Sequence, residues 1–83
     1  MVLEGTDNYG RPRQEFADRI SQESDEGLVL ICEDYVWLSA YASNNPRSDY
    51  HWMVDACYDE AKARGKVELY DRGWRLAAGR ARR

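Results

Sequence analysis

The thiols and the imidazole of this 83-residue chain belong to Cys32, Cys57 and His51, residue types that serve as nucleophiles, bases and metal ligands. A Cys–His pair can supply a nucleophile and its base, but six positions on a helix place His51 and Cys57 about 120° apart around the axis. A structural zinc site needs four closely spaced Cys or His ligands, more than the chain holds. Both cysteines lie in apolar stretches, where a free Cys is usually a small buried hydrophobic residue. The number of cysteines is also compatible with one disulfide between them. We therefore expect no catalytic residue, no metal and no cofactor, in a reduced, cytoplasmic protein.

The sequence also lacks the short motifs of common enzyme classes. It contains no G-x-S-x-G, no phosphate-cradling glycine loop and no H-E-x-x-H. Its many carboxylates are typical of a solvated surface. The sequence thus predicts a protein that is not an enzyme.

Charge is divided unevenly along the chain. Residues 1–60 hold thirteen Asp or Glu against four Arg, a balance of −9, whereas residues 61–83 hold eight Lys or Arg against two acids, a balance of +6. The net charge of −3 hides this division between an acidic body and a basic end. A polyanion could meet only the basic end, and the acidic body suits a basic protein surface.

Length and hydropathy limit the organisation to one small domain. A chain this short buries only about 60% of its unfolded surface, so we expect a thin core. No apolar run approaches the roughly 18 residues of a membrane span, and the first ten residues lack the pattern of a signal peptide. We expect a flexible N-terminal arm over 1–11, a single α+β domain over 12–78 and a basic tail over 79–83.

The first half of the domain combines one clear element with one ambiguous segment. Pro12 and the apolar spacing that follows predict a helix over 12–24, with Gly27 as its C-cap. The five apolar residues 28–32 predict a buried strand. Residues 35–42 fit a helix capped by Asp34 and also fit a strand, and the Ala and Ser residues of their second half favour the helix.

The second half carries stronger patterns. Apolar residues at helical spacing predict a helix over 49–64 that Gly65 ends. Residues 66–70 and 74–77 alternate like strands around Asp71-Arg72-Gly73, which predicts a β-hairpin.

The text "ACYDEAKARG" followed by "KVELYDRGWRLA" resembles the last helix and wing of winged helix-turn-helix domains. Met53, Cys57 and Ala61 stand at core positions of that helix, and Val67 stands where the first wing strand turns inward. The resemblance implies a winged-helix-like α+β fold of helix, short strand, helix, helix and C-terminal β-hairpin. An α-ββ-α-ββ two-layer fold is the alternative, because a plain helix followed by a hairpin would give the same sequence pattern at the C-terminus.

The resemblance implies a small regulator of transcription that binds duplex DNA through its wing and basic tail. Arg47, Ser48 and His51 would lie at the leading end of the recognition helix. The wing would contribute Arg72 and Arg75. The remaining phosphate contacts would come from Lys62, Arg64, Lys66, Arg80, Arg82 and Arg83, and their strength should fall steeply with salt.

The opposite side of the helix at 49–64 favours a different class of function. Trp52 projects there among Asp55 and Asp59, and two carboxylates would be repelled by DNA phosphates. The N-terminal arm or first helix could cover Trp52, or the ring could anchor a protein contact. The alternative function is therefore a small acidic inhibitor or adaptor, comparable to phage-type inhibitors of nucleic-acid-binding proteins, that binds a basic protein surface. A homodimer, with one copy's basic end on another's acidic body, is a further possibility.

Overall fold

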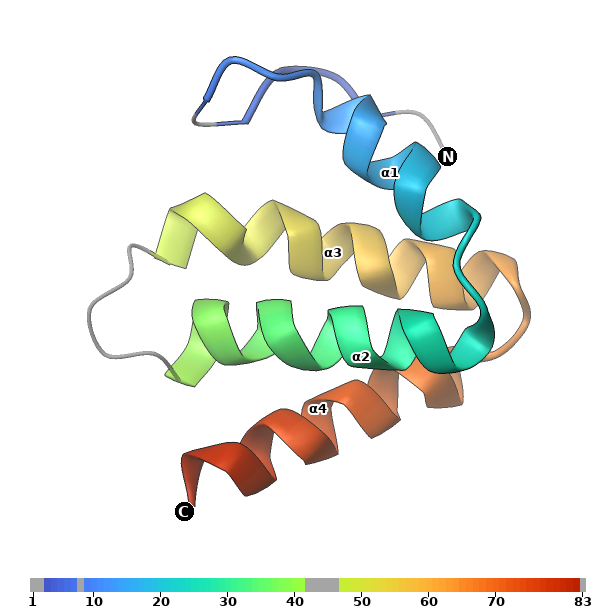
Figure 1. Ribbon diagram of the computed structural model, residues 1–83, viewed down its shortest axis with the longest axis vertical. Coiled ribbons are helices and arrows are strands. Elements are labelled where there is room, and N and C mark those ends of the chain that lie inside the picture. Colours follow the sequence, from blue (N-terminus) through green and yellow to red (C-terminus); the bar gives the residue numbers. More distant parts are fainter. Residues whose placement is uncertain (1–2, 8, 42–46, 83) are drawn as a thin grey trace.

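The computed structural model describes residues 3–7, 9–41 and 47–82, without the side chains of residues 47–49. These residues form four α-helices, α1 (Arg13–Ser21), α2 (Asp25–Val36), α3 (Arg47–Ala63) and α4 (Val67–Ala81), and a π-helical segment η1 (Trp37–Tyr41) continues α2 (Figure 1). The described part contains no β-strand and only one isolated bridge, between Thr6 and Pro12. The predicted α+β fold with a C-terminal wing is therefore wrong, and so is the α-ββ-α-ββ alternative.

Residues 28–32, predicted as a strand, lie in the middle of α2. Ser24 caps this helix, since its hydroxyl accepts a hydrogen bond of 3.0 Å from the Gly27 N–H. Gly27 thus belongs to the first turn of α2 and is not the C-cap of the preceding helix. A run of five apolar residues fits a strand and a helix equally well. The helix is distinguished by its buried positions, which are Leu28, Val29, Cys32 and Val36.

The helical prediction for residues 35–42 is confirmed as far as Tyr41, and residue 42 lies outside the described residues. The helix predicted over 12–24 is confirmed with shorter bounds as α1. Residues before α1 fold back on it, because the Leu3 N–H donates to Gln14 Oε1 at 2.7 Å and the Arg13 N–H to Gly5 O at 3.0 Å.

The predicted helix over 49–64 is confirmed as α3, and Gly65 ends it as expected. Gly65 has φ of 70°, in the left-handed region that favours glycine. The Gly65 N–H donates to Lys62 O and the Lys66 N–H to Ala61 O, the bonding pattern of a Schellman motif.

The predicted hairpin over 66–77 is wrong, because this segment is helical and forms most of α4. Its buried residues Leu69, Gly73 and Ala77 recur every four positions along one face of the helix. Gly73 resembled a turn residue in the sequence. In the structure it is a contact point between helices, where a Cβ would come within 2.5 Å of the Cys32 Cβ. The first residues of the predicted basic tail, 79–81, continue α4.

The helices form a flat molecule with principal extents of 35 × 30 × 14 Å. In Figure 1, α2 and α4 run in the same direction, α3 runs the opposite way beside α2, and α1 lies across the far side of α3. The most extensive helix contact is between the parallel pair, α2 and α4. The basic C-terminal helix therefore lies along a helix of the acidic body.

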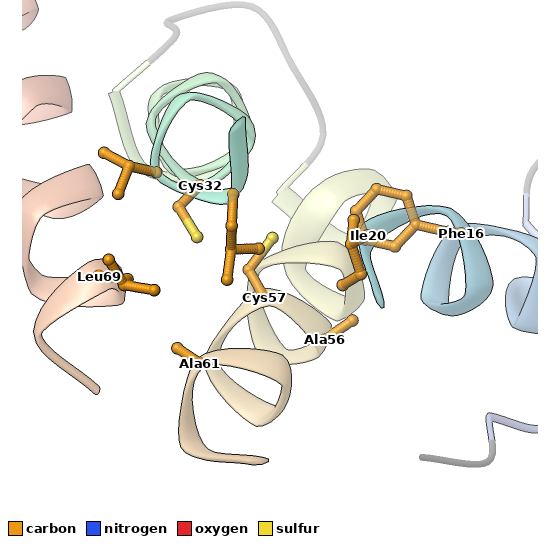
Figure 2. Packing of buried hydrophobic residues seen from close by; sticks show 9 residues of the cluster. Phe16, Ile20, Cys32, Ala56, Cys57, Ala61 and Leu69 are labelled. Atoms are coloured by element: carbon orange, nitrogen blue, oxygen red, sulfur yellow. The ribbon is translucent and has the colours of Figure 1, made fainter. Parts of the chain in front are cut away.

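The core lies between α1, α2, α3 and α4. Figure 2 shows Cys32 and Cys57 on facing helices, with Ile20 and Phe16 on the α1 side and Leu69 on the α4 side. Both cysteines are free thiols with no exposed surface. The hydrogen bond to Cys32, together with burial, raises the pKa of the Cys57 thiol. The two cysteines therefore act as small core residues.

Candidate functional site

Arg64, predicted to contact phosphate, instead joins three parts of the chain. Its guanidinium donates to Asp25 Oδ1 at 2.9 Å and to Glu60 Oε2 at 2.8 Å. It also donates to the backbone carbonyls of Ile20 at 2.9 Å and Glu23 at 2.8 Å, in the connection between α1 and α2. Only 16% of the side chain is exposed. Four of the five guanidinium N–H donors are therefore bonded within the protein.

The other basic residues near the start of α4 meet carboxylates of α2. Lys66 Nζ lies 2.6 Å from Asp25 Oδ2. Arg72 forms a two-pronged pair with Glu26, with distances of 2.9 and 3.1 Å. The two pairs place the first turns of α2 and α4 side by side.

The far end of α4 repeats this arrangement. Arg80 Nη1 lies 2.9 Å from Asp34 Oδ1 and 3.4 Å from Glu33 Oε2, and its guanidinium stacks 4.9 Å from the centre of the Trp37 ring. The order of the pairs, Glu26 with Arg72 and then Asp34 with Arg80, is the order expected for parallel helices.

These ion pairs change the pKa values of the groups involved. The hydrogen bond from Lys66, and to a smaller extent that from Arg64, lowers the pKa of Asp25. The hydrogen bond from Arg72 lowers the pKa of Glu26. The bond to Glu60 raises the pKa of Arg64. Each of these shifts favours the charged form of its group, so the pairs with α2 neutralise part of the basic end.

The remaining residues assigned to DNA take no part in the ion pairs found among the described residues. His51 and Lys62 are exposed on α3, and Arg75 and Arg82 are exposed on and just after α4. Arg47 and Ser48 lie in the first turn of α3 with side chains outside the described residues, and Arg83 is also outside them. The structure thus brings together Arg64 with Lys66 at Asp25, and Arg72 with Arg80 along α2.

Trp52 is half-buried beneath α1. Its ring meets Phe16 edge-on at 5.5 Å between centroids, and the Arg13 guanidinium lies 4.9 Å from its centre. Of the two predictions for this residue, cover by the first helix is confirmed. Its predicted neighbours Asp55 and Asp59 are exposed.

A row of four aromatic rings crosses α3, α4 and η1, and sequence reasoning missed it. Neighbouring ring centroids along it lie 5.1, 6.4 and 6.2 Å apart. Its outer members are exposed by 38% and 39%, and its inner members are half-buried. In order, the row consists of Tyr58, Tyr70, Trp74 and Tyr41. The four-residue spacing of Tyr70 and Trp74 was visible in the sequence, but the hairpin prediction placed these two residues on separate strands.

Exposed carboxylates lie on the same helices as this aromatic row. Asp55 and Asp71 each stand three residues before a ring of the row and so neighbour it on the helix surface. Burial raises the pKa of Tyr70, and the nearby Asp55 carboxylate contributes to the rise. Asp55, Asp59 and Asp71 are exposed and take part in none of the ion pairs found among the described residues. The α3–α4 face, defined here as the aromatic row with these three carboxylates, therefore combines exposed rings with unpaired negative charge.

Two surface hollows adjoin α1, with volumes of about 360 and 330 Å³. Arg19 and Tyr35 line both, and the Arg19 guanidinium lies 5.2 Å from the centre of the Phe16 ring. Carboxylates also line each hollow, Asp34 in one and Asp7 and Glu15 in the other. This mixture of charges selects neither an anionic nor a cationic ligand.

Over the described residues, no group of three or more His, Cys, Asp or Glu side chains is placed to hold a metal ion. None of the described helices has the length and hydropathy needed to cross a membrane. No protein-family model matches the chain, and neither does any curated protein or solved structure.

Proposed function

We propose that this protein is a small, non-enzymatic protein-binding inhibitor or adaptor whose α3–α4 face meets a basic surface on its partner. The observation that carries the proposal is the contrast between the two charged parts of the molecule. Four cations of the basic end are paired with carboxylates of α2, whereas the carboxylates of the α3–α4 face are exposed and unpaired among the described residues.

Charge favours a protein partner over DNA. Phosphate binding requires cations that can replace condensed counterions along the duplex. Four of the basic residues assigned to that task already have carboxylate partners at 2.6 to 2.9 Å. To bind these four cations, a polyanion would have to displace their carboxylate partners, and the acidic body would also repel it. DNA binding stays a prediction that no comparison tests.

The aromatic row supplies the apolar part of the surface. Tyrosine and tryptophan are enriched in protein interfaces because their rings bury a large area and keep a polar group at the edge. A partner's arginine could stack on a ring and pair with a neighbouring carboxylate at the same time, a combination that Tyr58 and Asp55 offer on one helix. We therefore expect the partner to present arginines among apolar side chains.

A native pull-down with nuclease treatment tests the proposal. Wild-type protein should retain a partner after nuclease digestion. The double variant Asp55→Lys/Asp59→Lys should lose it, because lysines would repel a basic surface. Glu4→Lys/Glu15→Lys, the same charge change on exposed residues near α1, is the matched control and should retain it.

Tyr58→Ala tests the aromatic contribution, with Tyr9→Ala as its control because Tyr9 is 89% exposed and far along the chain from the row. The proposal predicts weaker capture for Tyr58→Ala only. Capture that nuclease abolishes, or that survives both α3 variants unchanged, would contradict it.

A further inference from the structure

A second surface lies along the seam between α2 and α4, on different residues from the α3–α4 face. Two exposed leucines stand out there: Leu30 of α2 is 58% exposed and Leu76 of α4 is 46% exposed. Neither contributes to the two core clusters. Covering an apolar side chain with another surface removes it from water and lowers the free energy.

Ion pairs enclose these leucines at both ends. Leu30 lies four residues after Glu26 and four before Asp34, so the three side chains form one row along α2. The corresponding row along α4 has Leu76 in the middle and arginines at both ends, at positions 72 and 80. Because Glu26 pairs with Arg72 and Asp34 with Arg80, the two rows lie in register.

The surface therefore has an acidic row beside a basic row, with a leucine at the centre of each. We propose that a second copy of this chain covers it, forming a two-fold symmetric dimer whose axis runs parallel to α2 and α4. This inference goes beyond the proposed function and does not depend on it.

Charge complementarity selects both the partner and its orientation. A two-fold axis along the helices places α2 of one copy over α4 of the other, so each acidic row meets a basic row and Leu30 meets the partner's Leu76. An axis across the helices would place acid over acid and arginine over arginine, which is repulsive. In the parallel arrangement, each arginine lies between two carboxylates of different copies.

The exposure of the charged groups permits this second contact. The side chains of Glu26 and Asp34 are 71% and 67% exposed although each already has an arginine partner. An ionised carboxylate has acceptor sites for about four hydrogen bonds, so a further guanidinium can be accommodated. Each row is about 12 Å long at 1.5 Å per residue, which makes the patch small and the dimer weak.

Sedimentation equilibrium over a concentration series tests the proposal. The mass should rise from 9.7 kDa toward twice that value between about 10 μM and 1 mM, the range of weak interfaces. Leu30→Glu should remain at the mass of the monomer, because it adds a carboxylate to the acidic row and removes half of the apolar centre. Tyr58→Glu, a similar change on the α3–α4 face, should dimerise like the wild type.

Crosslinking tests the orientation. A mixture of Leu30→Cys and Leu76→Cys proteins, treated with a bismaleimide, should crosslink faster than either variant alone, because the parallel dimer brings these positions together. Circular dichroism melts should show that all variants fold. A wild type that stays monomeric throughout the series, a Leu30→Glu variant that still dimerises, or faster crosslinking of Leu30→Cys alone would overturn the proposal.

These outcomes are separable from those for the proposed function. Leu30→Glu should leave partner capture intact, and Asp55→Lys/Asp59→Lys should leave dimerisation intact. Failure of one proposal therefore does not imply failure of the other.

Discussion

Gly73 of α4 lies so close to Cys32 of α2 that a Cβ on the glycine would come within 2.5 Å of the cysteine Cβ. The same Cβ would lie 3.2 Å from the backbone N of Glu33 and 3.2 Å from the carbonyl oxygen of Val29. Backbone atoms in a helix cannot yield as a flexible side chain can. The close approach of the parallel helices, and with it the ion pairs along their seam, depends on this missing side chain.

Gly73→Ala should therefore destabilise the protein. Overpacking of a tight contact typically costs about 1–3 kcal/mol, which exceeds the gain of up to about 1 kcal/mol from better helix propensity. Gly79→Ala is the matched control in the same helix, because nothing lies within 4 Å of its added Cβ, and it should stabilise the protein. Urea unfolding monitored by circular dichroism measures both changes. Equal stabilisation by the two substitutions would show that α2 and α4 do not make this contact.

Arg64→Lys should also lower stability, by about 1–3 kcal/mol, because lysine keeps the charge but cannot reproduce the forked hydrogen bonds. The variant would leave the Ile20 and Glu23 carbonyls without their arginine donor. Arg75→Lys is the control, on an exposed residue of α4 with no ion pair among the described residues. Denaturant midpoints for the two variants should differ clearly. Equal denaturant midpoints for Arg64→Lys and Arg75→Lys would show that the hydrogen bonds of Arg64 do not stabilise the fold.

Ser24→Ala tests the start of α2. Loss of an N-cap hydroxyl typically costs about 0.5–2 kcal/mol, and here it would leave the Gly27 N–H without its partner. Ser24→Asp should retain most of the stability, since aspartate is an equally good N-cap. A Ser24→Ala variant as stable as the wild type would contradict the observed helix start.

Acid should weaken the fold through the seam carboxylates. The pKa values of Asp25 and Glu26 are lower in the folded protein than in the unfolded chain, where they are about 3.9 and 4.3. Their stabilisation is thus fully present above those unfolded values and is lost as the pH falls through the lower folded values. Unfolding measured from pH 7 to pH 2 should show this loss, and Glu26→Gln should flatten the pH dependence. Identical pH profiles for the wild type and Glu26→Gln would contradict the pairing of Glu26 with Arg72.

The elements with local signals were predictable from the sequence. Gly65 ends α3 because the chain there requires a positive φ, and a glycine after a helical pattern is a local signal for such a turn. Gly73 has an equally local appearance, since Asp-Arg-Gly resembles a hairpin loop. Its actual role is set by Cys32, forty-one residues earlier in the chain, and no local pattern contains that information.

The candidate site shows the same difference between features with a local sequence signal and features set by tertiary packing. The sequence revealed the basic end but not its partners, because Arg72 and Glu26 are 46 positions apart. Whether an arginine serves a fold or a ligand depends on which carboxylates the fold brings to it. The aromatic row was missed for the related reason that its members come from three elements whose packing is a tertiary property.

We propose that carboxylates of α2 neutralise Arg72 and Arg80 within the molecule, so that these arginines do not bind DNA. Titration of the protein into labelled duplex DNA at about 50 mM salt, where phosphate contacts are strong, measures this neutralisation. The wild type should give no shift, whereas Glu26→Gln/Asp34→Asn, which releases Arg72 and Arg80 from their carboxylates, should bind measurably. A wild-type shift that weakens at about 200 mM salt and disappears in Arg72→Ala/Arg80→Ala would show that these arginines do bind DNA.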